Sequence, residues 1–123
     1  MARILVCDDS AFMRMMLKRQ LTEDGHEIVG EAGDGKQAIE MYFKVRPDIT
    51  TMDITMPGLD GIQAVKHIHE EDPLAKIIMV TALGQRAIIT DALKAGASDF
   101  IIKPFEPEQV KVTINKILAE LKK

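Results

Sequence analysis

The sequence predicts an α/β fold, built on a doubly wound, five-stranded parallel sheet with five helices. Short apolar runs alternate with amphipathic segments along the 123 residues, and each run is followed by its own helical pattern. This alternation favours a parallel sheet with helices on both faces, because parallel strands need crossover connections. For five strands, the common doubly wound order is 2-1-3-4-5.

The five apolar runs are short, often β-branched, and bounded by Gly, Pro or Asp, which is typical of buried strands. Strands are expected at 4–7, 27–32, 48–52, 76–80 and 99–103. Gly30 interrupts the second run, which also carries acids near both ends. We therefore expect the second run to form an edge strand.

The helical patterns have starts and stops that are typical of α-helices. Helices are expected at about 10–23, 36–45, 61–71, 85–95 and 107–121. Ser10 suits an N-cap of the first helix, and Asp60 suits a turn or cap before the third. In the first helix, three methionines are expected to pack in the core: Met13, Met15 and Met16.

Composition predicts one ordinary globular domain over residues 1–123, with 46% hydrophobic and 28% charged residues. A net charge of −3 with interspersed signs argues against nucleic-acid binding. The apolar stretch near the N-terminus is too short for a signal peptide or a membrane span. The lone cysteine, Cys7, suits a reducing compartment. We therefore expect a cytoplasmic monomer that does not insert into membranes.

Polar side chains follow the strands close to the point where each strand ends. Asp8 and Asp9 follow the first strand, Asp53 the third and Thr81 the fourth, while Lys103 ends the fifth. Ligands of such sheets bind outside the carboxyl ends of the strands, where the strand order reverses. We expect these five side chains to meet at one edge of the sheet.

Three carboxylates in one place need positive charge. Two of them about 5 Å apart, at an effective dielectric constant near 20, repel by roughly 3 kcal/mol. Lys103 supplies one cation. Mg²⁺ would supply the remainder, because it prefers oxygen ligands and needs only a few carboxylates plus a phosphate.

These motifs resemble those of response-regulator receiver domains, a family with a flavodoxin-like fold, and especially its single-domain chemotaxis regulators. The matching stretches are "CDDS", "MDITMPGLDG", "TALG" and "KPF", in the order and at the strand ends that the family shows. The resemblance covers the whole chain.

The resemblance implies that Asp53 is the phosphoacceptor, which takes a phosphoryl group from a phosphohistidine. It also implies that Asp9, Asp53 and the backbone carbonyl of Thr55 bind Mg²⁺ directly, while Asp8 acts mainly through a water molecule. Lys103 would pair with a phosphoryl oxygen. Family members usually have a cis peptide bond at the position of Lys103-Pro104.

The resemblance further implies a conformational switch. Thr81 would move to the phosphoryl group and Phe100 would turn inward, which alters the face formed by the fourth helix, the fifth strand and the fifth helix. On that face, we expect Ile89 and Leu93 to be exposed and to contact a partner.

Two further positions are implied to tune the lifetime of the phosphate: Thr55, two residues after Asp53, and Leu83, two residues after Thr81. Leu83 cannot orient a water molecule by hydrogen bonding.

The expected function is that of a phosphorylated switch in chemotaxis. The expected partners are a CheA-like histidine kinase, a flagellar motor-switch protein and a phosphatase. Catalysis would be limited to the protein's own phosphorylation and dephosphorylation, so we do not expect an enzyme. The alternative is a phosphorelay carrier, which passes the phosphate to a histidine phosphotransfer protein.

Two other classes fit less well. Metal-dependent phosphohydrolases with an aspartate nucleophile commonly carry a second acid two residues later, where this chain has Thr55. A flavin or nucleotide binder would need a phosphate-binding loop after the first strand, and this chain has Asp8 and Asp9 there.

Overall fold

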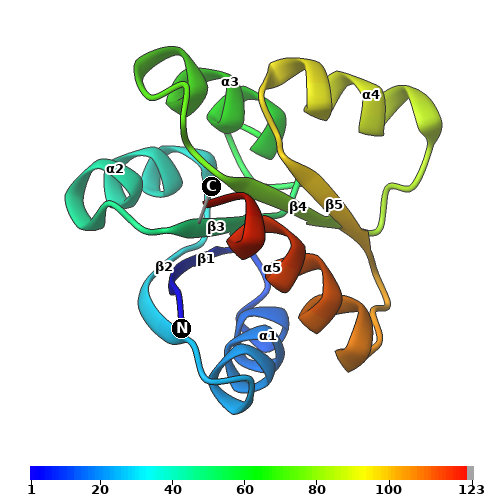
Figure 1. The fold of residues 1–123 in the computed structure, drawn as a ribbon. Helices are drawn as coiled ribbons and strands as arrows, with labels where there is room; N and C mark the ends of the chain where they lie inside the picture. Colours follow the sequence, from blue (N-terminus) through cyan, green and yellow to red (C-terminus); the bar gives the residue numbers. More distant parts are fainter. Residues whose placement is uncertain (122–123) are drawn as a thin grey trace.

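The computed structural model describes residues 1–121 and confirms the predicted fold class. Strands and helices alternate along the chain (Figure 1). They are β1 (Arg3–Cys7), α1 (Ala11–Glu23), β2 (Glu27–Ala32), α2 (Gly35–Val45), β3 (Ile49–Met52), α3 (Gly61–Glu71), β4 (Ile77–Thr81), α4 (Arg86–Ala95), β5 (Asp99–Ile102) and α5 (Pro107–Leu121).

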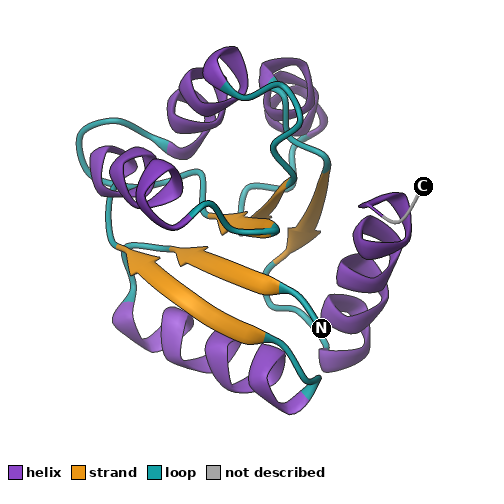
Figure 2. Ribbon diagram, turned by 60° about the vertical axis from the view of Figure 1, so that its left-hand side comes forward, coloured by secondary structure: helices purple, strands orange, loops and turns teal. Residues whose placement is uncertain are grey.

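The sheet lies between two layers of helices. Its order is β2-β1-β3-β4-β5, all neighbours are parallel, and β2 is an edge strand as expected. Helices α1 and α5 cover one face, and α2, α3 and α4 cover the other (Figures 1 and 2). Each face has its own apolar core, one centred on Ile114 and Ile117 of α5, the other on Val65 and Ile68 of α3.

Strand boundaries differ from the sequence prediction by about one residue. The fourth strand ends at Thr81 rather than Val80, and the fifth ends at Ile102 rather than Lys103. The reason is the register between these strands, since Thr81 pairs with Ile102 as the last pair. Lys103 therefore lies just beyond the sheet, where its side chain can turn toward the ends of other strands.

Side chains cap the first turns of three helices. Ser10 caps α1 by accepting a hydrogen bond from the Met13 N–H, and Asp34 caps α2 in the same way. Asp60 caps α3 and forms a reciprocal capping box with Gln63. Gln85, which precedes α4, makes no such hydrogen bond. The predicted caps at Ser10 and Asp60 are therefore confirmed.

The expectation that the methionines of α1 are core residues is wrong for two of them. Met15 and Met16 are 55% and 42% exposed, while Met13 is half-buried. The buried positions are Leu17 and Leu21. Apolar residues lie on several sides of this helix, so its helical period does not determine which side packs on the sheet.

Helix α4 presents one apolar stripe to the core and a second toward the surface. Ala92 is buried, and Ile88 and Ala95 pack against the core, as the spacing predicts. Leu93 is 43% exposed, whereas Ile89 is half-buried. The expected exposure is therefore confirmed for Leu93 and wrong for Ile89.

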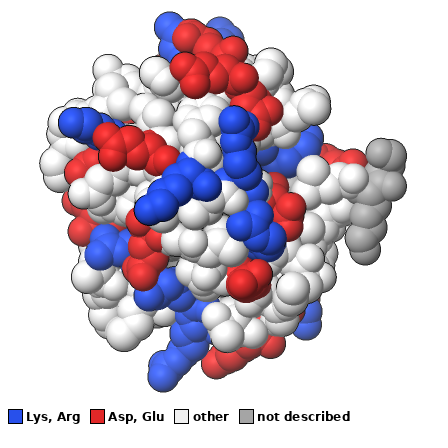
Figure 3. Space-filling view, turned by 90° about the vertical axis from the view of Figure 1, so that its left-hand side faces the viewer, with Lys and Arg blue, Asp and Glu red and all other residues white. Residues whose placement is uncertain are grey.

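Charges of both signs are interspersed over the surface on the side of β2 and α2 (Figure 3). In the described part of the chain, no helix has the length and apolar character needed to cross a lipid bilayer.

Candidate functional site

Residues from the carboxyl ends of β1, β3 and β5 meet at one edge of the sheet. Asp8 and Asp9 follow β1, Asp53 follows β3, and Lys103 follows β5. One carboxylate oxygen from each of the three aspartates lies within 4.8 Å of the others. The predicted convergence is therefore confirmed for the three aspartates.

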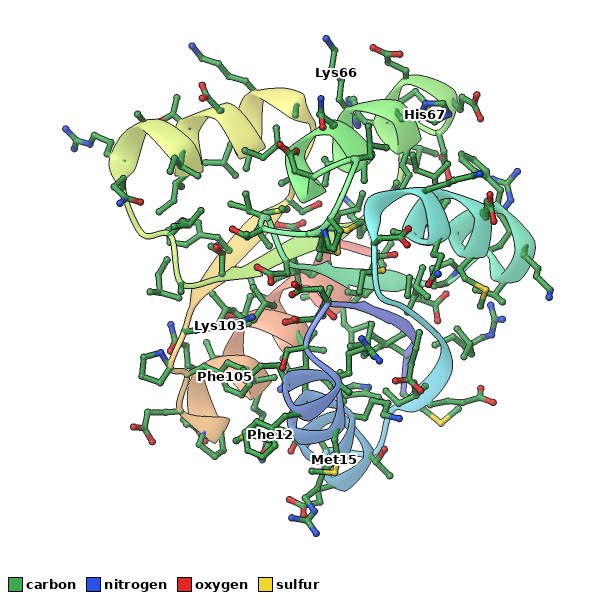
Figure 4. The ribbon with its side chains drawn as sticks, turned by 180° about the vertical axis from the view of Figure 1, so that it is seen from behind. Phe12, Met15, Lys66, His67, Lys103 and Phe105 are labelled. Carbon is green, nitrogen blue, oxygen red and sulfur yellow. The ribbon has the colours of Figure 1, made fainter. Side chains whose placement is uncertain are left out.

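Lys103 is the cation that faces these acids (labelled in Figure 4). Its Nζ lies 2.6 Å from Oδ2 of Asp8 and 3.4 Å from Oδ2 of Asp53. Its peptide bond to Pro104 is cis, as expected. Lys103 thus pairs mainly with Asp8 and only weakly with Asp53.

Asp53 is buried, and its ionised form is disfavoured. Burial is the largest cause that raises its pKa above the ordinary value, and the neighbouring charge of Asp8 raises it further. The Lys103 ammonium lowers the pKa but does not fully offset these two effects. The carboxylate of Asp53 therefore lies where additional positive charge would be strongly favoured.

Asp8 and Asp9 have different surroundings although they are adjacent. Asp8 is buried, and both its carboxylate oxygens accept hydrogen bonds, Oδ1 from the Ser10 N–H at 2.9 Å and Oδ2 from Lys103. Asp9 is exposed. The Asp9 carboxylate is therefore open to solvent at the edge of the cluster, while Asp8 is held inside it.

The first turn of α3 lies directly against Asp53. The Gly61 N–H donates to the Ile54 carbonyl at 2.8 Å, which brings the helix start to the end of β3. A Cβ on Gly61 would collide with the Asp53 carbonyl oxygen and lie 2.8 Å from its carbon. A glycine is thus required at this position, and the site depends on it.

Thr81 is buried at the end of β4, and its hydroxyl oxygen accepts a hydrogen bond from the Leu83 N–H at 3.0 Å. Leu83 is half-buried and packs against the apolar core to which α3 and α4 contribute. Thr55 is exposed in the segment after Asp53. Phe100, the predicted switch residue, is 36% exposed on β5 and so points outward.

One residue at the site was missed by the sequence analysis. The Arg14 guanidinium on α1 donates to the main-chain carbonyl of Asp8 and also to the Glu31 carboxylate on β2. The sequence contains little signal for this contact, because Arg14 binds a backbone oxygen that every residue has.

An apolar hollow of about 380 Å³ lies next to Lys103. Phe12 and Met16 of α1 line one side, and Pro104 and Phe105 line the other. Phe12, which is 62% exposed, lies near Phe105 in Figure 4. The charged site is therefore bordered by an exposed apolar surface.

The donor set suits a hard divalent cation. The three acids offer only oxygen atoms, and two of the three side chains are buried. A single ammonium group contacts them within the part of the chain that the structure describes. Three carboxylates beside one ammonium group leave an excess of negative charge, which fits a metal ion that prefers oxygen ligands.

Comparison with known proteins identifies the class that this fold and site define. Residues 4–115 match the model of the response regulator receiver domain. The chain therefore belongs to the response-regulator receiver family.

Within that family the chain is CheY-like. It is 54% identical to the chemotaxis protein CheY of Thermotoga maritima, over 94% of this chain and 96% of that protein. It is 53% identical to CheY of Bacillus subtilis, over 94% and 97% of the two chains. It is also 48% identical to the protein CcdB of Bacillus subtilis, over 97% and 99%.

Solved structures agree with this placement. The fold matches the CheX–CheY–BeF3–Mg²⁺ complex from Borrelia burgdorferi with a TM-score of 0.92, at 36% identity over 94% of this chain and 88% of that chain. It matches the response regulator domain of Thermotoga maritima CheB with a TM-score of 0.85, at 40% identity over 95% and 93%.

Proposed function

We propose that this protein is a phosphorylated switch in chemotaxis, in which Asp53 receives a phosphoryl group from a histidine kinase. The observation that carries the proposal is the convergence of three carboxylates and Lys103 at one sheet edge. Phosphoryl transfer requires mainly positioning and charge neutralisation, and this cluster offers both.

In the proposed reaction, a carboxylate oxygen of Asp53 attacks the phosphorus of a phosphohistidine. A phosphorus–oxygen bond forms, the phosphorus–nitrogen bond breaks, and the imidazole nitrogen keeps the electron pair. Lys103 offsets the negative charge on the transferred group from its position between Asp8 and Asp53. Mg²⁺, when bound, would add further positive charge beside the transferred group.

Asp9, Asp53 and the carbonyl of Thr55 would bind Mg²⁺ directly, and Asp8 would act through a water molecule. The unequal surroundings of the acid pair support this division. Both oxygens of Asp8 already accept hydrogen bonds, while Asp9 is exposed. Asp8 then serves mainly to hold Lys103 and the turn that follows β1.

The phosphoryl group would bias a conformational equilibrium. The Thr81 hydroxyl, which accepts a bond from Leu83, still has its own hydrogen to donate to a phosphoryl oxygen. The Phe100 side chain faces outward on β5, and turning it inward would change the face formed by α4, β5 and α5. Shifting such an equilibrium from 1:99 to 99:1 takes about 5.5 kcal/mol.

The proposed partners are a CheA-like kinase, a flagellar motor-switch protein and a phosphatase. The CheY proteins among the relatives support a chemotaxis role over that of a phosphorelay carrier. The solved complex of a CheY with CheX supports a further partner that resembles CheX. We also propose that the protein works in the cytoplasm and catalyses only reactions of its own phosphoryl group, with Thr55 and Leu83 tuning its lifetime.

Incubation with Mg²⁺ and acetyl phosphate tests this proposal. Intact-mass measurement is expected to show one added phosphoryl group, and hydroxylamine is expected to remove it, because an acyl phosphate reacts with that nucleophile. Chelating the metal should suppress the addition. No added mass, or an adduct that resists hydroxylamine, would contradict an aspartyl phosphate.

Mg²⁺ alone is expected to stabilise the folded protein. A ligand at ten times its dissociation constant adds about 1.4 kcal/mol to the free energy of unfolding, provided that it binds only the folded state. Urea unfolding followed by circular dichroism, with Mg²⁺ or with EDTA, measures this gain. Asp9→Asn should lose most of the gain, since it removes the exposed carboxylate. Equal gains in both proteins would place the metal elsewhere.

A further inference from the structure

Arg14 connects the acid pair to the edge strand of the sheet. Its Nη1 donates to the main-chain carbonyl of Asp8, and its Nε lies 3.1 Å from Oε1 of Glu31 on β2. The other oxygen of Glu31 lies 2.8 Å from Nζ of Lys18. One planar guanidinium thus joins the turn after β1 to a carboxylate on the neighbouring strand.

The carbonyl that Arg14 binds belongs to the peptide group between Asp8 and Asp9. A peptide group is planar, so holding its oxygen also fixes the direction in which the Asp9 backbone begins. The N–H of Asp8 is held as well, because it donates to the Ala32 carbonyl of β2 at 3.0 Å. Both sides of Asp8 are therefore tied to β2, and one of these ties depends on Arg14.

The charge of Glu31 suits this connection. The hydrogen bond from Lys18 is the largest cause that lowers the pKa of Glu31, and Arg14 adds to it. Glu31 is therefore ionised at neutral pH, and it offsets part of the positive charge that Arg14 brings to the edge of the site. The Arg14 side chain is 21% exposed, so solvent screens it only in part.

We propose that Arg14 is a positioning residue, which raises the affinity of the site for Mg²⁺ by fixing the peptide group that carries Asp9. The inference rests on the proposed function, because it assigns a role toward the metal that the function requires. It goes beyond that function because Arg14 is neither one of the three aspartates nor the Lys103 that contacts them.

Geometry and charge predict opposite effects of removing Arg14. A cation beside a metal site repels Mg²⁺, so on charge alone its removal tightens binding. If positioning dominates, removal loosens the Asp8–Asp9 turn and weakens binding. Loss of a partner that orients a metal ligand typically costs roughly tenfold or more in affinity.

The experiment measures the Mg²⁺ dissociation constant from urea unfolding, followed by circular dichroism across a Mg²⁺ series. Circular dichroism suits this chain, because it has no tryptophan whose fluorescence could report unfolding. Arg14→Met is expected to raise the constant about tenfold. Arg14→Lys keeps the charge but lacks the planar fork, and it should also bind Mg²⁺ more weakly.

Arg19→Met is the matched control, because Arg19 is exposed on the same helix and the change removes the same charge. It should change the Mg²⁺ dissociation constant less than twofold. Glu31→Gln should weaken Mg²⁺ binding, because it removes the ionised acceptor that holds Arg14.

Each outcome decides between the explanations. If Arg14→Met binds Mg²⁺ as tightly as the parent protein or more tightly, the positioning role is overturned and the proposed function stands. A variant that is less stable in EDTA, with an unchanged Mg²⁺ constant, likewise overturns it, since Arg14 is then only a link between α1 and β2. If the parent protein gains no stability from Mg²⁺, this inference and the proposed function fail together.

Discussion

Replacing Asp53 with Asn is expected to abolish phosphoryl transfer to the protein. The amide oxygen is a far weaker nucleophile than a carboxylate, and no other acid has the same position at the end of β3 between Asp8 and Lys103 in the described residues. After incubation with acetyl phosphate and Mg²⁺, intact mass should show no added phosphoryl group, which is a loss of at least 100-fold relative to the parent protein.

Misfolding should not explain this loss. Burial and the charge of Asp8 raise the pKa of Asp53, so the folded state disfavours the ionised carboxylate. A neutral side chain removes that cost, and the variant should be at least as stable in EDTA at neutral pH. A variant that still acquires a hydroxylamine-sensitive phosphoryl group would contradict Asp53 as the phosphoacceptor. A variant that is less stable than the parent protein in EDTA would contradict the expectation that the buried carboxylate is costly.

Asp60→Asn is the matched control for this experiment. Asp60 is another aspartate of the segment between β3 and α3, but it caps α3 rather than facing the acid cluster. Asn is about as good an N-cap as Asp, so the helix should keep its start. The control protein should accept one phosphoryl group as the parent does.

Replacing Gly61 with Ala is expected to destabilise the protein by about 3 kcal/mol, near the upper end of the usual cost of overpacking. The added Cβ would meet the Asp53 carbonyl and lie 2.9 Å from Cα of Ile54, which are backbone atoms. Side-chain rotation cannot relieve such a contact, so α3 or the end of β3 must move. Urea unfolding followed by circular dichroism measures the loss.

Gly84→Ala provides the comparison for Gly61→Ala. A Cβ at Gly84 would lie 3.5 Å from the end of the Ile102 side chain, which is ordinary van der Waals contact. This variant should lose much less stability than Gly61→Ala. Equal losses would mean that the collision at Asp53 is not the cause. A displaced Asp53 should also slow phosphorylation of any Gly61→Ala protein that remains folded.

Much of the fold and the acid cluster could be predicted from the sequence, because the relevant signals are local. Short β-branched runs mark the strands, and in a parallel sheet their carboxyl ends share one edge. Asp8, Asp53 and Lys103 therefore converge whatever the details of the loops. The caps at Ser10 and Asp60 are local in the same sense.

Other features depend on tertiary contacts that a sequence pattern does not encode. Helix α1 has apolar residues on several sides, and only packing on the sheet decides that Leu17 is buried and Met15 exposed. The pairing of Lys103 with Asp8 follows from where β5 ends. Arg14 was missed because its partner is a main-chain carbonyl.

The uncapped start of α4 has a dynamic consequence. A missing N-cap costs a helix about 1 kcal/mol, and this cost applies to α4 but not to α1, α2 or α3. Local unfolding of the first turn of α4 is therefore less costly than fraying of its neighbours, and its amide hydrogens should exchange faster with solvent. The first turn of α4 begins a few residues after the hydrogen bond that the Leu83 N–H donates to the Thr81 hydroxyl. A rearrangement that begins at Thr81 thus reaches a segment that can reorganise while the sheet and the capped starts of α1, α2 and α3 stay intact.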